Sequence, residues 1–353
     1  MKVLQKFKPK DTIHKILIST TSRFRGEFSS KNIAICHAWP RSQSAPATMR
    51  MEESPSSRSG FVLAFQTEKR EGSILIPDYS PTGDVICSYL AVLFGKRFDS
   101  HGLIEGSGFY NIPDLSLYAT LCDHTLPFNT HRPREDFRVP LRLENLSSVL
   151  DALEVLNKHP GKEDRIRVAC KFYMQSLQNA ERDVEVAYLH LVAAGEVLSS
   201  LFDYDNNTLM DDATKKDFVK IEECLGSDGI KIVNRLGRKL QWVKKRFTSS
   251  IVRLLDDKFY VDKMNAFTKA NINASIGAAY DLRSKYVHSG TSFGHWIKPN
   301  SRFGDVMLGK PVVEDGDFAK ILEKAPTYLG LERMIRYCIL KYLNQVKPLK
   351  FIE

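Results

Sequence analysis

The pattern of apolar residues changes near residue 145, and this change constrains the fold more than any other feature. Before it, apolar runs are short and are interrupted by Gly, Pro and Asp, as in FVLAF (61–65) and SILIPDY (73–79). Such runs are typical of β-strands joined by turns. After it, apolar residues recur at helical spacing in successive segments. The sequence therefore predicts an α+β fold, with a small mixed α/β domain followed by an all-α bundle.

We divide the chain into three parts on this basis. Residues 1–59 form a basic N-terminal segment with a Ser/Pro-rich linker. Residues 60–145 form a mixed α/β domain of unknown role, and residues 146–353 form the all-α domain. A chain of 353 residues is long enough for two or three domains.

The first part is the least regular in sequence. The stretch Pro40–Gly60 is rich in Ser, Pro and Arg and lacks a periodic apolar pattern, so we expect a loop or a disordered linker. Before it, Ile13–Ile18 can form a strand. An alternative is that translation begins at Met49 or Met51, in which case residues 1–48 are not part of the protein.

Several helix ends can be predicted from single residues. Gly95 ends a short buried helix, and Gly290 lies in the C-cap position of a later one. Asp183 caps a largely apolar helix that we expect at the centre of the bundle. One long helix is expected across residues 229–257, and the last helical stretch should break near Pro326.

The net charge of +9 is unevenly distributed. Residues 1–51 hold 10 basic and 2 acidic residues, residues 52–160 hold 10 and 15, and residues 161–353 hold 31 and 25. Nearly all of the excess positive charge therefore comes from residues 1–51. A high overall basicity is the first indication of a nucleic-acid-binding protein, but here it is weak evidence.

Several classes of site lack their sequence signatures. No apolar run approaches the 18 residues of a membrane-spanning helix. The six cysteines are scattered and form no CxxC pair, which indicates reduced thiols and a cytoplasmic protein. Cys36-His37 and Cys122-x-His124 have no second pair at metal-ligand spacing, so we expect no metal. No Gly-rich phosphate-binding loop is present, and we expect no cofactor.

The most informative string is AYDLRSKYVHSG, residues 279–290, near the end of a predicted helix. It contains Arg283 and His288, which are five residues apart and point about 140° apart on an ideal helix. Histidine can transfer a proton near neutral pH, and arginine can hold the charge of a phosphate in its transition state. The two side chains converge only if His288 lies in a frayed last turn. From spacing alone, chance placement is the simpler explanation.

This string resembles the Arg-x4-His motif of HEPN domains (higher eukaryotes and prokaryotes nucleotide-binding), with the Apea-like group as the nearest match. The earlier segment ERDVEVAYLHLVAAGEVLSSLF resembles the family's second core helix, and Glu196 stands where the family has an acidic or polar residue. The resemblance covers roughly residues 160–345. It implies an α-bundle that pairs as a homodimer, so that two Arg/His motifs share one cleft.

The resemblance also implies an activity and roles for these residues. Many HEPN domains are metal-independent endoribonucleases in phage defence, toxin systems or RNA processing, in which the RNA 2′-hydroxyl attacks the adjacent phosphate. His288 is then the general acid or base, Arg283 stabilises the phosphorane, and Glu196 orients one of them. Ser284 and Tyr286 are supporting residues. Ser284 replaces the family's usual Asn, Asp or His, and Gly290 replaces a Tyr that some toxins use for regulation.

Residues 229–255 contain eight cations and no acid. We expect this predicted helix to be either a solvated face or a contact for the RNA backbone. The candidate RNA-binding residues are Arg235, Arg238, Lys239, Lys244, Lys245 and Arg246. A further candidate is the loop that holds Phe293, His295 and Trp296, which either packs on the core or stacks on a nucleotide.

The first hypothesis is thus a cytoplasmic, homodimeric endoribonuclease with RNA as its partner and a regulatory protein or phage product as its trigger. The second is a non-catalytic HEPN module that binds RNA or a protein. A third is a purely structural dimerisation bundle. These hypotheses differ in whether His288 is required for cleavage, for binding, or for neither.

Overall fold

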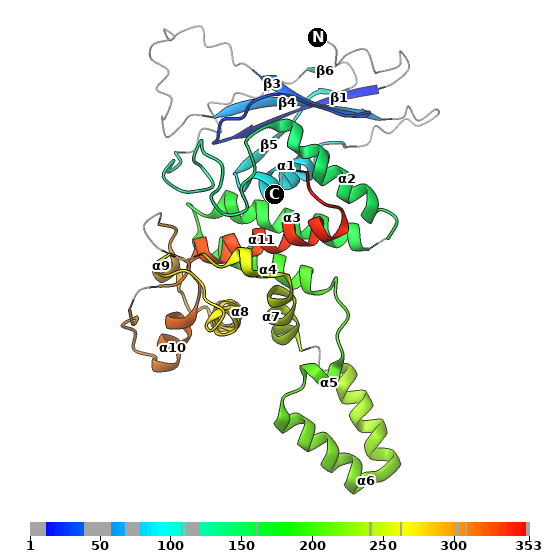
Figure 1. Ribbon diagram of the computed structural model, residues 1–353, viewed down its shortest axis with the longest axis vertical. Helices are drawn as coiled ribbons and strands as arrows, with labels where there is room; N and C mark the ends of the chain where they lie inside the picture. The colour runs from blue at the N-terminus through cyan, green and yellow to red at the C-terminus, as the bar shows by residue number, and fades with distance from the viewer. Residues whose placement is uncertain are drawn as a thin grey trace.

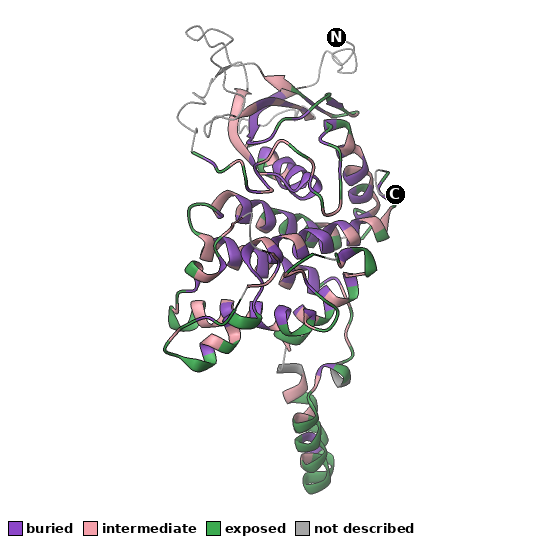
Figure 2. Ribbon diagram, turned by 60° about the vertical axis from the view of Figure 1, so that its left-hand side comes forward, coloured by how far each residue is buried: buried purple, intermediate pink, exposed green. Residues whose placement is uncertain are grey.

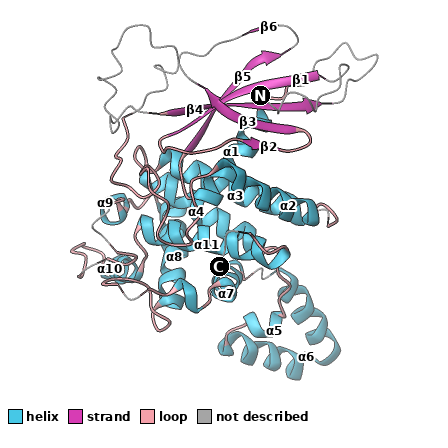
Figure 3. Ribbon diagram, turned by 45° about the horizontal axis from the view of Figure 1, so that its top comes forward, coloured by secondary structure: helices cyan, strands magenta, loops and turns pink. Residues whose placement is uncertain are grey.

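The computed structural model describes most of the chain. The ranges that it describes are residues 12–38, 58–67, 78–106, 109–110, 121–159, 161–239, 242–261, 263–300, 304–307 and 309–350. Apart from α1, which lies between β4 and β5 in the sequence, the strands come first and the helices follow, as the apolar pattern predicts. Figure 3 shows the sheet on one side of the molecule and the helices on the other.

The sheet has six strands among the described residues, in the order β2-β3-β4-β1-β5-β6, and every pair is antiparallel. Strand β1 pairs with β4 along its full length, with Ile16 opposite Leu63, and with β5 on its other side. Alternate residues of β4 from Phe61 to Phe65 are buried because one face of the sheet packs on the core, whereas Ile16–Thr20 of the inner strand β1 are all buried. The strands are β1 (Thr12–Thr20), β2 (Phe28–Ser29), β3 (Ile33–Ala38), β4 (Ser59–Thr67), β5 (Phe98–Gly106) and β6 (Phe109–Tyr110).

The structure corrects the predicted division at residue 59. The expected strand at Ile13–Ile18 is confirmed, but it is an inner strand of the same sheet that β4 and β5 form. A chain begun at Met49 or Met51 would lack β1, and β4 and β5 would lose the strand between them. Residues 12–38, which hold β1, β2 and β3, are therefore part of the fold. Most of the predicted linker, residues 39–57, lies outside the described residues.

Helix α1 (Pro81–Phe94) lies between the sheet and the helical part of the protein. It packs against β5 on one side and α3 on the other, and its residues from Ile86 onward are all buried. The predicted end at Gly95 is confirmed, because Gly95 adopts a φ of 60°, in the left-handed region that glycine tolerates best. Figure 1 shows α1 beneath the sheet and above the bundle.

The helical part is built around α4, as its apolar sequence predicts. Helix α4 packs against α3, α7, α8 and α11. The helices after α1 are α2 (Leu146–Leu156), α3 (Lys162–Asn179), α4 (Val184–Ser199), α5 (Asn206–Leu209), α6 (Asp212–Lys239), α7 (Val243–Leu254), α8 (Ile272–Ser289), α9 (Gly294–Ile297), α10 (Gly316–Lys324) and α11 (Tyr328–Val346).

The N-cap that Asp183 supplies to α4 can be tested by mutation. Its side chain accepts a hydrogen bond from the backbone N–H of Val186 at 3.0 Å. We expect Asp183→Ala to lower the free energy of unfolding by about 1 kcal/mol, because the backbone N–H of Val186 in the first turn of α4 loses its acceptor. Urea denaturation measures this change. The exposed Asp217→Ala variant is the control, and it should stay within about 0.5 kcal/mol of the wild type.

The long helix predicted across residues 229–257 is wrong. Helix α6 ends at Lys239, Trp242 adopts a φ of 49°, and α7 begins at Val243. Helix α6 is itself interrupted at Gly226, where φ is 51° and ψ is −124°. The predicted break near Pro326 is confirmed, since α10 and α11 are separate helices and the Thr327 hydroxyl caps α11.

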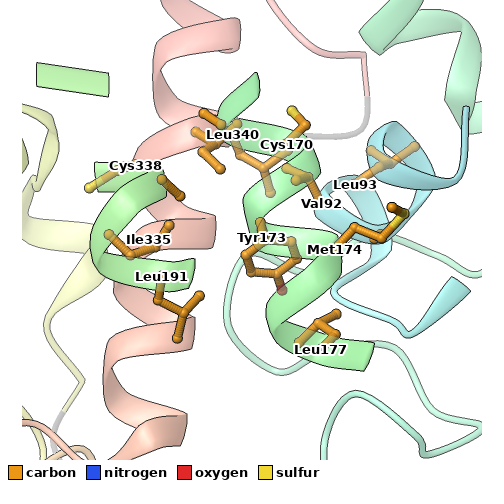
Figure 4. Close-up of a cluster of buried hydrophobic side chains, with 14 of the residues drawn as sticks. Val92, Leu93, Cys170, Tyr173, Met174, Leu177, Leu191, Ile335, Cys338 and Leu340 are labelled. Atoms are coloured by element: carbon orange, nitrogen blue, oxygen red, sulfur yellow. The ribbon is translucent and has the colours of Figure 1, made fainter. Parts of the chain in front are cut away.

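The predicted boundary at residue 145 marks a change of element type but not a boundary in packing. One continuous apolar core extends from the sheet through α1 into the bundle. Figure 4 shows Val92 and Leu93 of α1 beside Tyr173 and Met174 of α3, with Ile335 of α11 close by. The two parts of the described chain therefore share a core.

Buried charges reinforce this junction. The guanidinium of Arg336 in α11 is fully buried and donates to the carbonyl oxygens of Val92 and Leu93 in α1. Arg134, which precedes the helical part, forks onto the Glu332 carboxylate of α11 at 2.9 and 2.7 Å. These bonds connect segments about 200 residues apart in the sequence.

Candidate functional site

The string AYDLRSKYVHSG forms the second half of α8. Ile276, Ala279 and Leu282 are buried against the bundle, and Gly290 ends the helix with a φ of 66°, as predicted. The polar residues of the string are therefore placed on the outer side of a well-packed helix.

Arg283 lies beside Glu196, as the resemblance predicts. Glu196 comes from α4, and its Oε2 lies 3.6 Å from an Nη of Arg283. The side chains are 21% and 29% exposed, so the pair is accessible to a ligand. The Arg283 guanidinium also lies 5.8 Å from the centre of the Tyr280 ring. Tyr280 was not among the predicted residues, although its position three residues before Arg283 places both on one face of the helix.

The environment of Glu196 shifts its proton affinity. Partial burial raises the pKa of Glu196, and this rise is opposed by the Arg283 cation and by the hydrogen bond from Tyr280. Burial and the neighbouring Glu196 carboxylate raise the pKa of Tyr280. Tyr280 therefore remains a hydrogen-bond donor to Glu196, while Arg283 faces the same carboxylate as an ion pair.

His288 is separated from this pair within one chain. It is exposed and lies in the last turn of α8, which stays helical through Ser289 instead of fraying. Five residues of helix place it about 7.5 Å along the axis from Arg283 and about 140° around it. In the described part of the chain, His288 makes no hydrogen bond or ion pair. One chain therefore exposes both side chains but does not join them.

The supporting residues have different surroundings. Ser284 is half-buried on α8, and Tyr286 packs its ring edge-on against Phe293 at 5.7 Å. Partial burial and the carboxylates of Glu185 and Asp183 raise the pKa of Tyr286. Lys285 instead forms an ion pair with Asp315 at 2.8 Å, which connects α8 to the start of α10.

The loop after the motif packs on the core. Phe293 is 1% exposed, so of the two alternatives for this residue the structure supports packing on the core and not stacking on a nucleotide. The Glu185 carboxylate accepts from the backbone N–H groups of Phe293 and Gly294 and fixes the loop to α4. Trp296 packs against the same core, whereas His295 is exposed.

The predicted basic residues do not form one continuous helical face. The break at Trp242 places Arg235, Arg238 and Lys239 on α6 and the other three on α7. The side chains of Arg238 and Lys239 lie outside the described residues, and Arg235 is exposed.

Carboxylates from other segments compensate part of this charge. Lys244 pairs with Asp281 of α8 at 2.6 Å, and Lys245 lies 3.9 Å from Asp211. Arg246 stacks on the Tyr204 ring, 5.6 Å from its centre. Although residues 229–255 contain no acid, Lys244 and Lys245 therefore have carboxylates near them from other segments. The first of these pairs joins α7 to α8, the helix that carries Arg283.

In the described part of the chain, no group of three His, Cys, Asp or Glu side chains is arranged to hold a metal ion. Cys122 Sγ lies 3.4 Å from His124 Nε2. None of the helices in the described ranges is long and apolar enough to cross a membrane. Comparisons of the chain with protein-family models, with characterised proteins and with solved structures give no match.

Proposed function

We propose that this protein is a metal-independent endoribonuclease whose site contains Arg283, His288 and Glu196. The observation that supports this proposal most is the Arg283–Glu196 pair. A partly buried guanidinium on α8 is paired with a carboxylate from α4, about one and a half turns before an exposed histidine. The resemblance of the α8 string to the HEPN motif supplies the reaction type.

The chemistry assigns one task to each side chain. The RNA 2′-hydroxyl loses its proton, its oxygen bonds to the adjacent phosphorus, and the bond from phosphorus to the 5′-oxygen breaks. The products are a 2′,3′-cyclic phosphate and a 5′-hydroxyl. His288 transfers one of the two protons. Arg283 binds the non-bridging oxygens as their charge increases, and Glu196 holds its guanidinium in place.

A homodimer would supply what one chain lacks. Arg283 and His288 of one chain point in different directions, so a two-fold pairing of bundles that brings two motifs together would place His288 of one copy near Arg283 of the other. The same separation favours a second candidate, a non-catalytic module that binds RNA or a protein. In that case Arg283 and Glu196 form a binding surface, and His288 transfers no proton.

One experiment separates the two candidates. Purified protein is incubated with total RNA in excess EDTA, and the new ends are mapped chemically. The endoribonuclease predicts cleavage with 2′,3′-cyclic phosphate and 5′-hydroxyl ends. The binding module predicts that RNA is retained on the protein with its length unchanged.

RNA binding by the basic residues gives a separate prediction. We expect Lys245→Glu and Arg235→Glu each to weaken binding similarly for all RNA sequences, because both side chains would contact phosphates rather than bases. Each change should lower the slope of log K against log salt by about 1. Filter binding at several salt concentrations measures this. Lys310→Glu, an exposed lysine before α10, is the control. If all three variants have the same slope, Lys245 and Arg235 do not contact RNA.

A further inference from the structure

Helix α6 forms an arm that projects from the rest of the protein. We call residues 212–239 the arm. Its two halves fold back on each other at Gly226, and they approach so closely that a Cβ at Gly229 would lie 2.3 Å from the carbonyl oxygen of Ile221. The arm makes no extended packing contact with another helix or strand of the described chain. Figures 1 and 2 show it extending away from the bundle, with most of its surface exposed.

The arm leaves apolar side chains in solvent. Val219, Leu225 and Ile230 are each about half exposed, at 50%, 53% and 51%. Two short helices that pack only on each other bury one face apiece, and helices of about 14 residues are marginally stable without further packing. Exposed apolar residues on an isolated hairpin therefore indicate that something covers it.

Charged side chains surround Val219 and indicate the kind of surface that would pack against it. Lys215 and Lys216 precede Val219 by four and three residues, and Glu222 and Glu223 follow it by three and four. Side chains at these spacings share one helix face. All four charged residues are exposed. The face therefore has two cations, a central valine and two anions in order along the axis.

These four charged side chains do not form ion pairs with one another within the arm. Lys215 is seven residues from Glu222, and Lys216 is seven from Glu223, which is about 10.5 Å along a helix. Among the described residues, the ion pairs of these four side chains are limited to a 4.0 Å contact between Lys215 and Asp212. In a second copy that lies antiparallel to the first, however, the same face places its anions opposite the cations of the first copy.

We propose that the arm is a self-association surface through which two copies of this chain pair. The two copies lie antiparallel, with Val219 of each against Val219 of the other. Lys216 of each copy then meets Glu222 of the other, and Lys215 meets Glu223. A two-fold axis forms each of these contacts twice. Lys215, Val219 and Glu222 of this face line a groove of about 1090 Å³ together with Tyr204, Phe218 and Val233, and this groove receives part of the second helix.

The second copy fits this face better than a nucleic acid does. A phosphate backbone needs an excess of cations, and this face has as many anions as cations. A helix of 14 residues is about 21 Å long, so the interface is at the small end of the range for specific association. We expect a dissociation constant of about 1–100 µM. The arm is a different surface from the bundle face whose pairing is suggested for RNA cleavage, so only the change in association caused by the arm charges bears on this inference.

Charge exchange tests the pairing directly. One variant of the full chain carries Lys215→Glu and Lys216→Glu, and the other carries Glu222→Lys and Glu223→Lys. Sedimentation equilibrium measures association of the wild type, of each variant, and of their equimolar mixture. A control variant reverses two exposed charges outside the arm, Lys310→Glu and Glu314→Lys.

We expect the wild type and the control to dimerise and each arm variant alone to associate at least tenfold more weakly, because like charges then face each other. The equimolar mixture should recover dimers, since the all-acidic face complements the all-basic one. A wild type that stays monomeric at several hundred micromolar would overturn the proposal. So would arm variants that dimerise as the wild type does, or a mixture that stays monomeric. Circular dichroism checks that both variants keep their helices.

Discussion

His288→Ala should lower the rate of RNA cleavage by about 10²–10⁴-fold while the protein remains folded. The reduction is the usual contribution of a general acid or base. The fold should be unaffected because His288 is exposed in the last turn of α8 and makes no hydrogen bond or ion pair in the described part of the chain. Initial rates on a defined RNA measure the first effect, and thermal unfolding measures the second.

His295→Ala is the matched control for this variant. His295 is also exposed, and it lies seven residues further along in the loop that Glu185 holds against α4. We expect cleavage by His295→Ala to stay within a few-fold of the wild type. If both variants cleave as fast as the wild type, His288 transfers no proton and the assignment fails.

Arg283→Lys tests the other half of the motif. A lysine keeps the positive charge but cannot fork onto two phosphate oxygens, and it loses the planar contact with the Tyr280 ring. Cleavage should fall while RNA binding changes little. Loss of binding without any effect of His288→Ala would instead favour the non-catalytic module.

Local signals were sufficient for much of the helical part. Gly95 and Gly290 end their helices because both adopt positive φ angles, and Asp183 caps α4 through its own side chain. These interactions involve residues within one turn of each other, so the sequence around them contains the information. Glu196 was placed beside Arg283 by the resemblance, since no local pattern connects α4 with α8.

Non-local pairing explains what the sequence did not reveal. Strand β1 appeared to be an isolated apolar run, because its partners β4 and β5 lie about 40 and 80 residues further along. The ion pair between Lys244 and Asp281 joins two helices, so an acid-free stretch of sequence did not mean an uncompensated surface. The break at Trp242 has no local signature, since a tryptophan rarely adopts a positive φ.

The second large effect concerns stability. Glu332→Gln should lower the free energy of unfolding by about 3–5 kcal/mol, the usual cost of removing one partner from a buried ion pair. Glu332 is fully buried. Its two carboxylate oxygens accept hydrogen bonds from the two terminal nitrogens of Arg134, and one of them also accepts from the Tyr173 hydroxyl. Chemical denaturation measures the change, and the exposed Glu314→Gln variant should show almost none.

The charges around Glu332 explain why this cost is high. Arg134, Arg336 and Lys96 are buried together, and the carboxylates near them are Glu332 and Asp136. Burial and the two guanidinium groups lower the pKa of Lys96 to about 6, although Glu332 and Asp136 oppose this shift. A neutral side chain at residue 332 would leave buried cations with one carboxylate, which the low dielectric of the core makes unfavourable.

The same variant tests whether the sheet and the bundle unfold together. Because Glu332 and Arg336 bind Arg134 and the end of α1, weakening this junction should destabilise both parts at once. We therefore expect near- and far-ultraviolet circular dichroism to report one shared transition, shifted to lower denaturant in Glu332→Gln. Two separate transitions in the wild type, with one of them unmoved by the substitution, would show that the two parts are independent domains. In that case the shared core would not couple them.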